Sequence, residues 1–253
     1  MPHVVRTALV LGLLLGVTST AKGQVPPPPP PPLWDVQTGL SFVATGGNSD
    51  TTTVGADFGM HRRWPDWILE SAATAVRSTS RDVRTAERYI GAVRGLRKLS
   101  EIVGVTAGER AERDRLAGLD FRSILDGGLS WAIRREPHWT LDGVTALAWL
   151  HEQPTTGLER NDPAGVFQLL SKVPFGAAAD STQRITYYPN FRTTSAYRSE
   201  AEVTAQAAIN GRLAMKFGYL WRYAKTPVPG FRTSDDLVTA SIVVRWKSTV
   251  LAR

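Results

Sequence analysis

Apolar and polar residues alternate with a period of two along most of the chain, which is the pattern of β-strands with one apolar face. In the clearest run, 213–223, apolar side chains occupy every second position from Leu213 to Tyr223. Lys216 and Arg222 lie on the opposite face of that run. The same alternation recurs at 53–61, 121–134 and 198–209. The pattern therefore predicts an all-β protein.

The alternating runs and the turn residues between them predict about twelve strands, within a range of about 10–14. Their approximate positions are 34–45, 51–63, 67–79, 85–98, 100–112, 121–135, 138–151, 165–174, 182–190, 196–209, 212–224 and 236–247. Connections after even-numbered strands are mostly short, and those after odd-numbered strands are mostly longer and more polar. A bacterial barrel with both termini in the periplasm shows this alternation. Two connections depart from it, a short first loop at 46–50 and a long turn near 175–181.

A soluble periplasmic ligand-binding barrel would show the same alternation with its apolar face turned inward, and it stays open as an alternative. Two features favour a membrane barrel: charges of both signs along the polar faces, which suit a wet lumen, and aromatic residues toward the strand ends. No segment after Trp34 reaches the roughly 18 uninterrupted apolar residues of a membrane helix. We therefore expect an antiparallel transmembrane β-barrel over 34–247 with a short tail at 248–253. Its last strand ends on an aromatic residue, Trp246.

The N-terminal region predicts export. Residues 1–23 combine Arg6, a short apolar core and a small-residue cleavage site, as in a secretory signal peptide. Residues 24–33 follow as a proline-rich spacer, because consecutive prolines form a stiff polyproline II rod that cannot join a sheet. The expected location is the outer membrane of a Gram-negative cell.

Composition limits the remaining classes of function. The chain has no cysteine, which excludes disulfides and thiolate metal sites. Of 30 basic residues, Arg6 and Lys22 leave with the signal, so 28 remain against 23 acids and the charge falls from +7 to +5. These basic residues are spread along the chain, so nucleic acid is not an expected partner.

Five short segments in order resemble the family of unknown function typified by the salt-induced outer-membrane proteins. They are 46–52 (GGNSDTT), 112–122 (ERDRLAGLDFR), 127–131 (GGLSW), 188–191 (YPNF) and 226–236, which begins TPVPG. Together they extend over roughly 34–246. The resemblance implies an outer-membrane barrel and a link to salt or envelope stress, and it implies no catalytic residues.

Two sets of charged residues are candidates for a functional role at the rim or in the lumen. The rim set is Arg110, Glu112, Arg113, Asp114, Arg115, Asp120 and Arg122. The lumen set is Arg198, Glu200, Glu202, Lys216 and Arg222. The rim set could stiffen a hairpin, or form a charged constriction or a dock for lipopolysaccharide phosphates. The lumen set could neutralise itself across neighbouring strands or line a narrow selective pore. The loop acids Glu159, Asp162, Asp235 and Asp236 are expected to be solvated.

An enzyme is not expected. A lipid hydrolase, the alternative for a barrel of this size, would need a serine, a histidine and an orienting group within reach. Only His151 is expected near the outer rim, and no serine lies in a recognisable nucleophile motif. The expected function is that of a structural barrel or narrow pore of the cell envelope. Its expected partners are outer-membrane lipid, lipopolysaccharide and the barrel-assembly machinery, with no cofactor or metal; the sequence fixes no oligomeric state.

Overall fold

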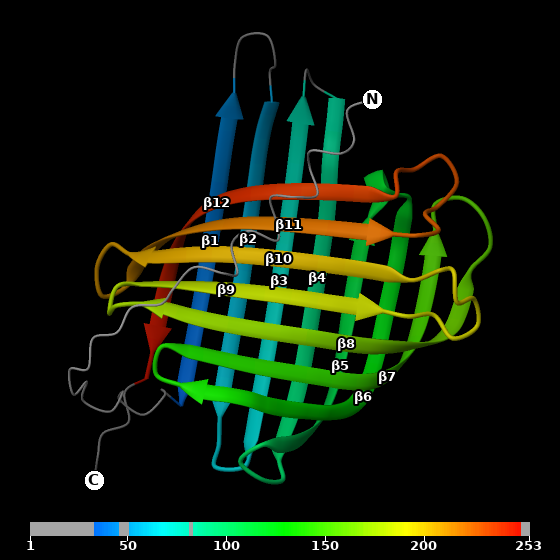
Figure 1. The fold of residues 1–253 in the computed structure, drawn as a ribbon. Helices are drawn as coiled ribbons and strands as arrows, with labels where there is room; N and C mark the ends of the chain where they lie inside the picture. Colours follow the sequence, from blue (N-terminus) through cyan, green and yellow to red (C-terminus); the bar gives the residue numbers. More distant parts are fainter. Residues whose placement is uncertain (1–32, 46–50, 81–82, 249–253) are drawn as a thin grey trace, which may run out of the picture. The chain divides into compact units, whose positions relative to one another are not determined.

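The structure is a computed structural model that describes residues 33–45, 51–80 and 83–248. The expected signal at 1–23, most of the expected spacer and the expected first loop at 46–50 lie outside these residues. Twelve strands form a closed barrel in which each strand is antiparallel to its neighbours (Figure 1). The predicted all-β antiparallel barrel of about twelve strands is therefore confirmed. No helix in the described ranges is long and apolar enough to cross a membrane.

The strands follow the chain around the barrel. They are β1 (Trp34–Thr45), β2 (Thr51–Arg63), β3 (Trp67–Ser80), β4 (Val83–Lys98), β5 (Val103–Asp114), β6 (Leu119–Glu136), β7 (Trp139–Pro154), β8 (Arg160–Phe175), β9 (Ala179–Tyr188), β10 (Arg198–Ala208), β11 (Leu213–Ala224) and β12 (Ser234–Lys247). A 3-10 turn, η2 (Arg115–Ala117), joins β5 to β6. Pairing of β1 with β12, from Asp35 opposite Lys247 to Ser41 opposite Ser241, closes the sheet and removes its free edges.

The two ends of the barrel differ in their connections. At one end, which we call the turn end, the connections are 64–66, 99–102, 137–138, 176–178 and 209–212. At the other, the loop end, the described connections are 115–118, 155–159, 189–197 and 225–233. The expectation of a long turn near 175–181 is wrong, because β8 continues to Phe175 and β9 begins at Ala179. Gly176, with φ 69, supplies the left-handed conformation that the tight turn requires.

The start of β8 also differs from the sequence prediction. Residues 161–163 are polar or proline and were expected in a loop, yet Asp162 pairs with Leu150 of β7 inside the ladder. Asp162 is buried rather than solvated, and its carboxylate accepts a hydrogen bond of 2.8 Å from the amide of Asn190. Pairing with β7 thus overrode the local turn signal.

The barrel is apolar outside and polar inside. Outward side chains such as Leu40, Phe42 and Leu147 are 70–72% exposed, although they sit within strands. Buried lumen positions carry polar groups, including Asp126 and Thr186. An apolar layer on the inner wall interrupts this pattern; it consists of Ile124, Ala146, Ala148, Leu150, Ala164 and Val166, with Val144 and Tyr188 packed against it.

A β-bulge in β6 changes the face of the barrel on which Arg134 lies. The register of β6 on β7 shifts between Ala132 and Arg134, which reverses the alternation beyond it. Arg134 then lies opposite Leu141 and stacks over the ring of Trp139, 4.4 Å from its centroid, on the outward face. Strict alternation through the predicted run 121–134 would place Arg134 on the inner face with Asp126, and the bulge makes that placement wrong.

Adjacent glycines in β6 give a matched test of how tightly this sheet is packed. A Cβ on Gly128 would lie 2.1 Å from the carbonyl oxygen of Thr145 and 2.5 Å from Cα of Ala146, both rigid backbone atoms. A Cβ on Gly127 would meet nothing nearer than the carbonyl oxygen of Thr106 at 3.9 Å. We expect Gly128→Ala to destabilise the barrel by about 3 kcal/mol through overpacking, and Gly127→Ala to change stability little.

Urea unfolding midpoints of the refolded variants measure this difference, with heat-modifiable gel migration as the readout of the folded barrel. Equal midpoints for the two alanine variants would show that β6 and β7 separate easily at Gly128.

Candidate functional site

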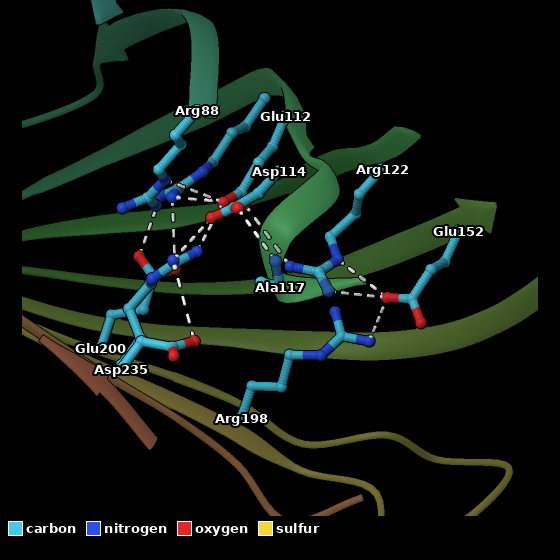
Figure 2. Close-up of polar contacts among 11 residues, drawn as sticks. Arg88, Glu112, Asp114, Ala117, Arg122, Glu152, Arg198, Glu200 and Asp235 are labelled. Carbon is cyan, nitrogen blue, oxygen red and sulfur yellow. Dashed lines mark hydrogen bonds and ion pairs between the residues drawn. The ribbon is translucent and has the colours of Figure 1, made fainter. Parts of the chain in front are cut away.

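The two sets of charges singled out in the sequence meet in the lumen near the loop end. Figure 2 shows their side chains converging from opposite walls around the 3-10 turn. Ion pairs of 3.7 Å or less join nine residues into one connected set, which we call the charge network: Arg88, Arg110, Glu112, Asp114, Arg122, Glu152, Arg198, Glu200 and Arg222. They come from β4, β5, β6, β7, β10 and β11. The charge network is therefore a tertiary feature that no single hairpin contains.

Local alternation explains why these side chains point inward. On β5 the even-numbered residues, Arg110, Glu112 and Asp114 among them, lie on the lumen face, whereas Arg113 is exposed. The same rule places Arg222 of β11 and Glu200 of β10 inside, one opposite the other in the β10–β11 register. Each of these strands thus delivers its charges to the same level of the lumen.

Several ion pairs cross the lumen from wall to wall. Nη1 of Arg222 donates to Oε1 of Glu112 at 2.8 Å, and Nη2 donates to Oδ2 of Asp114 at 2.7 Å. These residues lie on β11 and β5. Five strands lie between these two in each direction around the barrel. Arg110 of β5 also makes a bidentate hydrogen bond to Glu200 of β10, with Nη1 donating to Oε2 at 3.0 Å and Nη2 to Oε1 at 3.2 Å. Side chains that meet from opposite walls obstruct the lumen at this level.

Glu112 is the centre of the charge network. Its carboxylate lies 3.1 Å from Nε of Arg88, 3.4 Å from Nη1 of Arg122 and 3.7 Å from Nη2 of Arg110, besides the bond from Arg222. The side chain is only 2% exposed. A carboxylate taken out of water this completely needs such partners, because desolvation of an unpaired ion costs several kcal/mol.

Glu152 of β7 is a second, smaller centre. One of its oxygens, Oε2, accepts from Arg122 at 2.8 Å and from Arg198 at 2.5 Å. Because Arg122 also reaches Glu112, it links the two centres into one network. Neither Glu152 nor Arg88 was predicted from the sequence. Both lie at even-numbered positions, which point inward in 83–98 and 139–154, so applying this alternation along both strands would have indicated them.

Other predicted charges lie outside the charge network. Arg115 and Asp120 pair with each other at 2.8 Å at the rim, where both are about half exposed. In the lumen nearer the turn end, Glu202 pairs with Arg184 at 2.9 Å. Lys216 pairs at 3.6 Å with Asp57 of β2. Glu202 and Arg184 are 36% and 45% exposed, so this part of the lumen is more open than the level of the charge network.

Loops from opposite walls cover the network at the loop end. Asp114 accepts a hydrogen bond from the backbone N–H of Ala117 at 3.1 Å and so starts η2, which ends on Gly118 at φ 77. A Cβ on Gly118 would lie 2.7 Å from the ring of Phe231 and 2.9 Å from Cβ of Val228. The β11–β12 loop is therefore packed directly on the β5–β6 turn, across the mouth of the barrel.

Of the residues that a lipid hydrolase would need, His151 lies opposite Ser123 in the β6–β7 register, and the Ser123 hydroxyl donates to Glu109 at 3.1 Å. No hydrogen bond between Ser123 and His151 is found among the described residues. Nδ1 of His151 lies 2.8 Å from the side-chain oxygen of Asn161, and its ring faces Phe121 at 6.2 Å. His61 lies 3.2 Å from Glu70. In the described part of the chain, no group of three or more His, Asp and Glu side chains is placed to hold a metal ion. What the arrangement offers is an electrostatic barrier in a confined space.

Sequence comparison identifies one family. The family model described as a protein of unknown function, DUF481, matches residues 38–246. No curated protein matches the chain in sequence.

Solved structures with a similar backbone come from outer-membrane proteins. The outer membrane channel COG4313 from Pseudomonas putida F1 is 11% identical over 85% of this chain and 95% of its own, with a TM-score of 0.49. The NanC porin is 13% identical over 86% of this chain and 100% of its own, with a TM-score of 0.47. The translocator domain of the autotransporter NalP from Neisseria meningitidis is 12% identical over 85% and 88%, with a TM-score of 0.43.

Proposed function

The chain belongs to the DUF481 family of proteins of unknown function, and on that premise we propose that it is an outer-membrane barrel that acts as a narrow channel, closed at rest by the charge network. The observation that carries this proposal is the set of ion pairs joining β5 to β10 and β11 across the lumen. The substrate class is small ions and small polar solutes, because the lumen beyond the network is lined by charged side chains.

Three features support placement in a membrane. The sheet is closed, so every strand finds its backbone partners within the barrel, as a spanning structure in lipid requires. Large apolar side chains are exposed along the outer faces of the strands, where water would disfavour so many of them. The connections at the turn end have two to four residues, whereas two at the loop end have nine. Short periplasmic turns and long outer loops are the usual arrangement.

The charges that cross the lumen have alternative partners on their own walls. Arg222 lies 3.9 Å from Asp235 of the adjacent strand β12, and its register neighbour on β10 is Glu200. Glu112 has Arg88 and Arg122 on the strands that flank it. If the cross-lumen pairs separated, both walls could still neutralise their charges. An opening of this kind leaves Asp114 with the backbone N–H of Ala117, and it leaves the other separated charges with ionic partners on their own walls. Its cost is therefore smaller than that of breaking an isolated buried pair.

Single-channel recording in planar bilayers tests the gate. We expect the wild type to be mostly closed with brief openings. Arg222→Gln removes hydrogen bonds to charged groups worth about 1.5–3 kcal/mol in the closed state, which raises the open probability about tenfold or more. Glu112 and Asp114 keep arginine or backbone partners in that variant, so the barrel is expected to fold.

Asp235→Asn provides the matched control in the opposite direction. It removes the acid that would receive Arg222 on its own wall, so the open probability is expected to fall below that of the wild type. Silence of all three proteins over many insertions would sink the channel proposal and leave a scaffold role. Equal open probabilities would show that the charge network is not the gate.

The remaining elements of the proposed function need tests in cells. The resemblance to salt-induced outer-membrane proteins implies a role in envelope adaptation, for which growth and permeability of a deletion strain across a range of salt are the measurement. At the loop end, the exposed Arg113 and the half-exposed Arg115 are candidates for contact with lipopolysaccharide phosphates, because guanidinium groups bind phosphate with two parallel hydrogen bonds.

A further inference from the structure

Arginines stack on tryptophans at the turn end of the barrel. The guanidinium carbon of Arg62 lies 4.2 Å from the ring centroid of Trp34 and 5.1 Å from that of Trp64. Arg97 lies 5.7 Å from the ring of Trp67. The contact between Arg134 and Trp139 described above is of the same kind. The described residues contain no other arginine–tryptophan stacking, so all of it lies at the turn end.

The stacked pairs face outward, away from the lumen. Arg62 stands directly opposite Trp34 in the β1–β2 register, and Arg97 directly opposite Trp67 in the β3–β4 register. The three tryptophans at 34, 64 and 67 are 38–50% exposed. The face they form is therefore available to whatever surrounds the barrel at this level.

Aromatic residues are distributed unequally between the two ends. Six of the eight tryptophans lie near the turn end: Trp34, Trp64, Trp67, Trp131, Trp139 and Trp246. Near the loop end the outward aromatic contacts are built mainly from tyrosines, such as Tyr197 between Tyr187 and Tyr223. Tryptophan prefers the boundary between lipid tails and head groups, which identifies the turn end as one such boundary.

Two of the stacked arginines have no acidic partner. No ion pair among the described residues involves Arg62 or Arg97, whereas Arg134 is held 2.5 Å from Glu136. A ring beneath a guanidinium occupies one of its faces and leaves its N–H groups in the plane free to donate. Two unpaired cations at head-group level, each with donors directed sideways, match a phosphate that lies beside the barrel.

We propose that Arg62 and Arg97, supported by Trp34, Trp64 and Trp67, form a binding belt for anionic phospholipid head groups around the turn end. The inference rests on the proposed membrane location and not on the channel. It gives the barrel a preferred lipid in the periplasmic leaflet, which consists of phospholipid, and so contributes to a fixed orientation and depth in the bilayer.

Quenching of tryptophan fluorescence by brominated lipid tests the belt. The full chain is refolded into phosphatidylcholine vesicles that contain either brominated phosphatidylglycerol or brominated phosphatidylcholine, and the ratio of quenching reports the preference for the anionic lipid. We expect a several-fold preference for the wild type. Arg62→Gln/Arg97→Gln is expected to lose this preference, so that its quenching ratio falls close to one.

Arg77→Gln/Arg232→Gln is the matched control. It removes two exposed arginines near the loop end, one from β3 and one from the β11–β12 loop, that take part in none of the described stacking contacts. The control is expected to keep the wild-type preference. An equal loss in both variants, or no preference in the wild type, overturns the belt. So does a change of oligomeric state confined to the Arg62/Arg97 variant, which would make this face a contact between subunits.

Heat-modifiable migration of each refolded sample separates the two proposals. If the wild type fails to insert into vesicles, the membrane location itself has failed. If it inserts but shows no lipid preference, only the belt has failed, whatever the conductance measurements give.

Discussion

Glu112→Gln is expected to destabilise the barrel by about 3–5 kcal/mol, the cost of removing one partner from a buried ion pair. Four arginines surround this carboxylate, which is 2% exposed, and Arg222 reaches it from the opposite wall. An amide keeps the shape of the side chain and removes the negative charge. The four guanidinium groups would then repel one another in a space that water enters poorly.

Urea unfolding of refolded protein measures this loss, and Glu202→Gln is its control. Glu202 is also a lumen glutamate with an arginine partner, but it is 36% exposed, so its variant is expected to lose less than about 1 kcal/mol. Removing a cation as well, in Glu112→Gln/Arg88→Gln, is expected to recover part of the stability by reducing the repulsion. Similar losses for the Glu112 and Glu202 variants would contradict the description of Glu112 as the centre of the charge network.

Leu147→Arg is expected to cost the membrane-inserted barrel about 2–4 kcal/mol, the value for an arginine facing lipid near the middle of the bilayer. Leu147 lies at the middle of β7 and is 72% exposed. For a soluble barrel the same substitution on an exposed position would be nearly neutral. The result therefore distinguishes the membrane location from the soluble alternative.

Leu158→Arg is the matched control for the lipid face. Leu158 is 86% exposed, but it lies in the β7–β8 loop outside the strands, so its variant is expected to fold and insert like the wild type. Folding yield into vesicles and unfolding midpoints are the measurements. Normal insertion and stability of the Leu147 variant would mean that lipid does not surround this face of β7.

The lumen is obstructed by ion pairs and not by apolar side chains, and this difference helps to distinguish a gate from a permanent plug. Buried ion pairs add little net stability over apolar residues of the same volume, because desolvation offsets most of the attraction between the charges. An apolar layer already packs the inner wall below the network, from Ile124 and Leu150 to Val166. Extending that layer would have closed the lumen as firmly. Charges that can exchange partners instead allow the closure to be undone, which favours a gate over a permanent plug.

Local patterns of apolar and polar residues were sufficient to predict the strands. The alternation from Leu213 to Tyr223 requires one apolar and one polar face in any extended conformation, and it reappears in β11 with Lys216 and Arg222 inside. Where the prediction failed, contacts between strands overrode the local signal. The bulge in β6 turned Arg134 outward, and pairing with β7 drew Asp162 out of its expected loop.

The sequence by itself determined the fold class, the strand positions and which charges lie on the inner faces, because side-chain alternation is a property of each strand alone. Only the tertiary structure decided which charges meet. Arg222 and Glu112 are 110 residues apart, and their contact depends on closure of the sheet, on the number of strands and on their stagger. Those quantities belong to the whole barrel, so no single segment carries them. The predicted polar faces thus became one charge network, with Arg88 and Glu152 as members that local reasoning had not named.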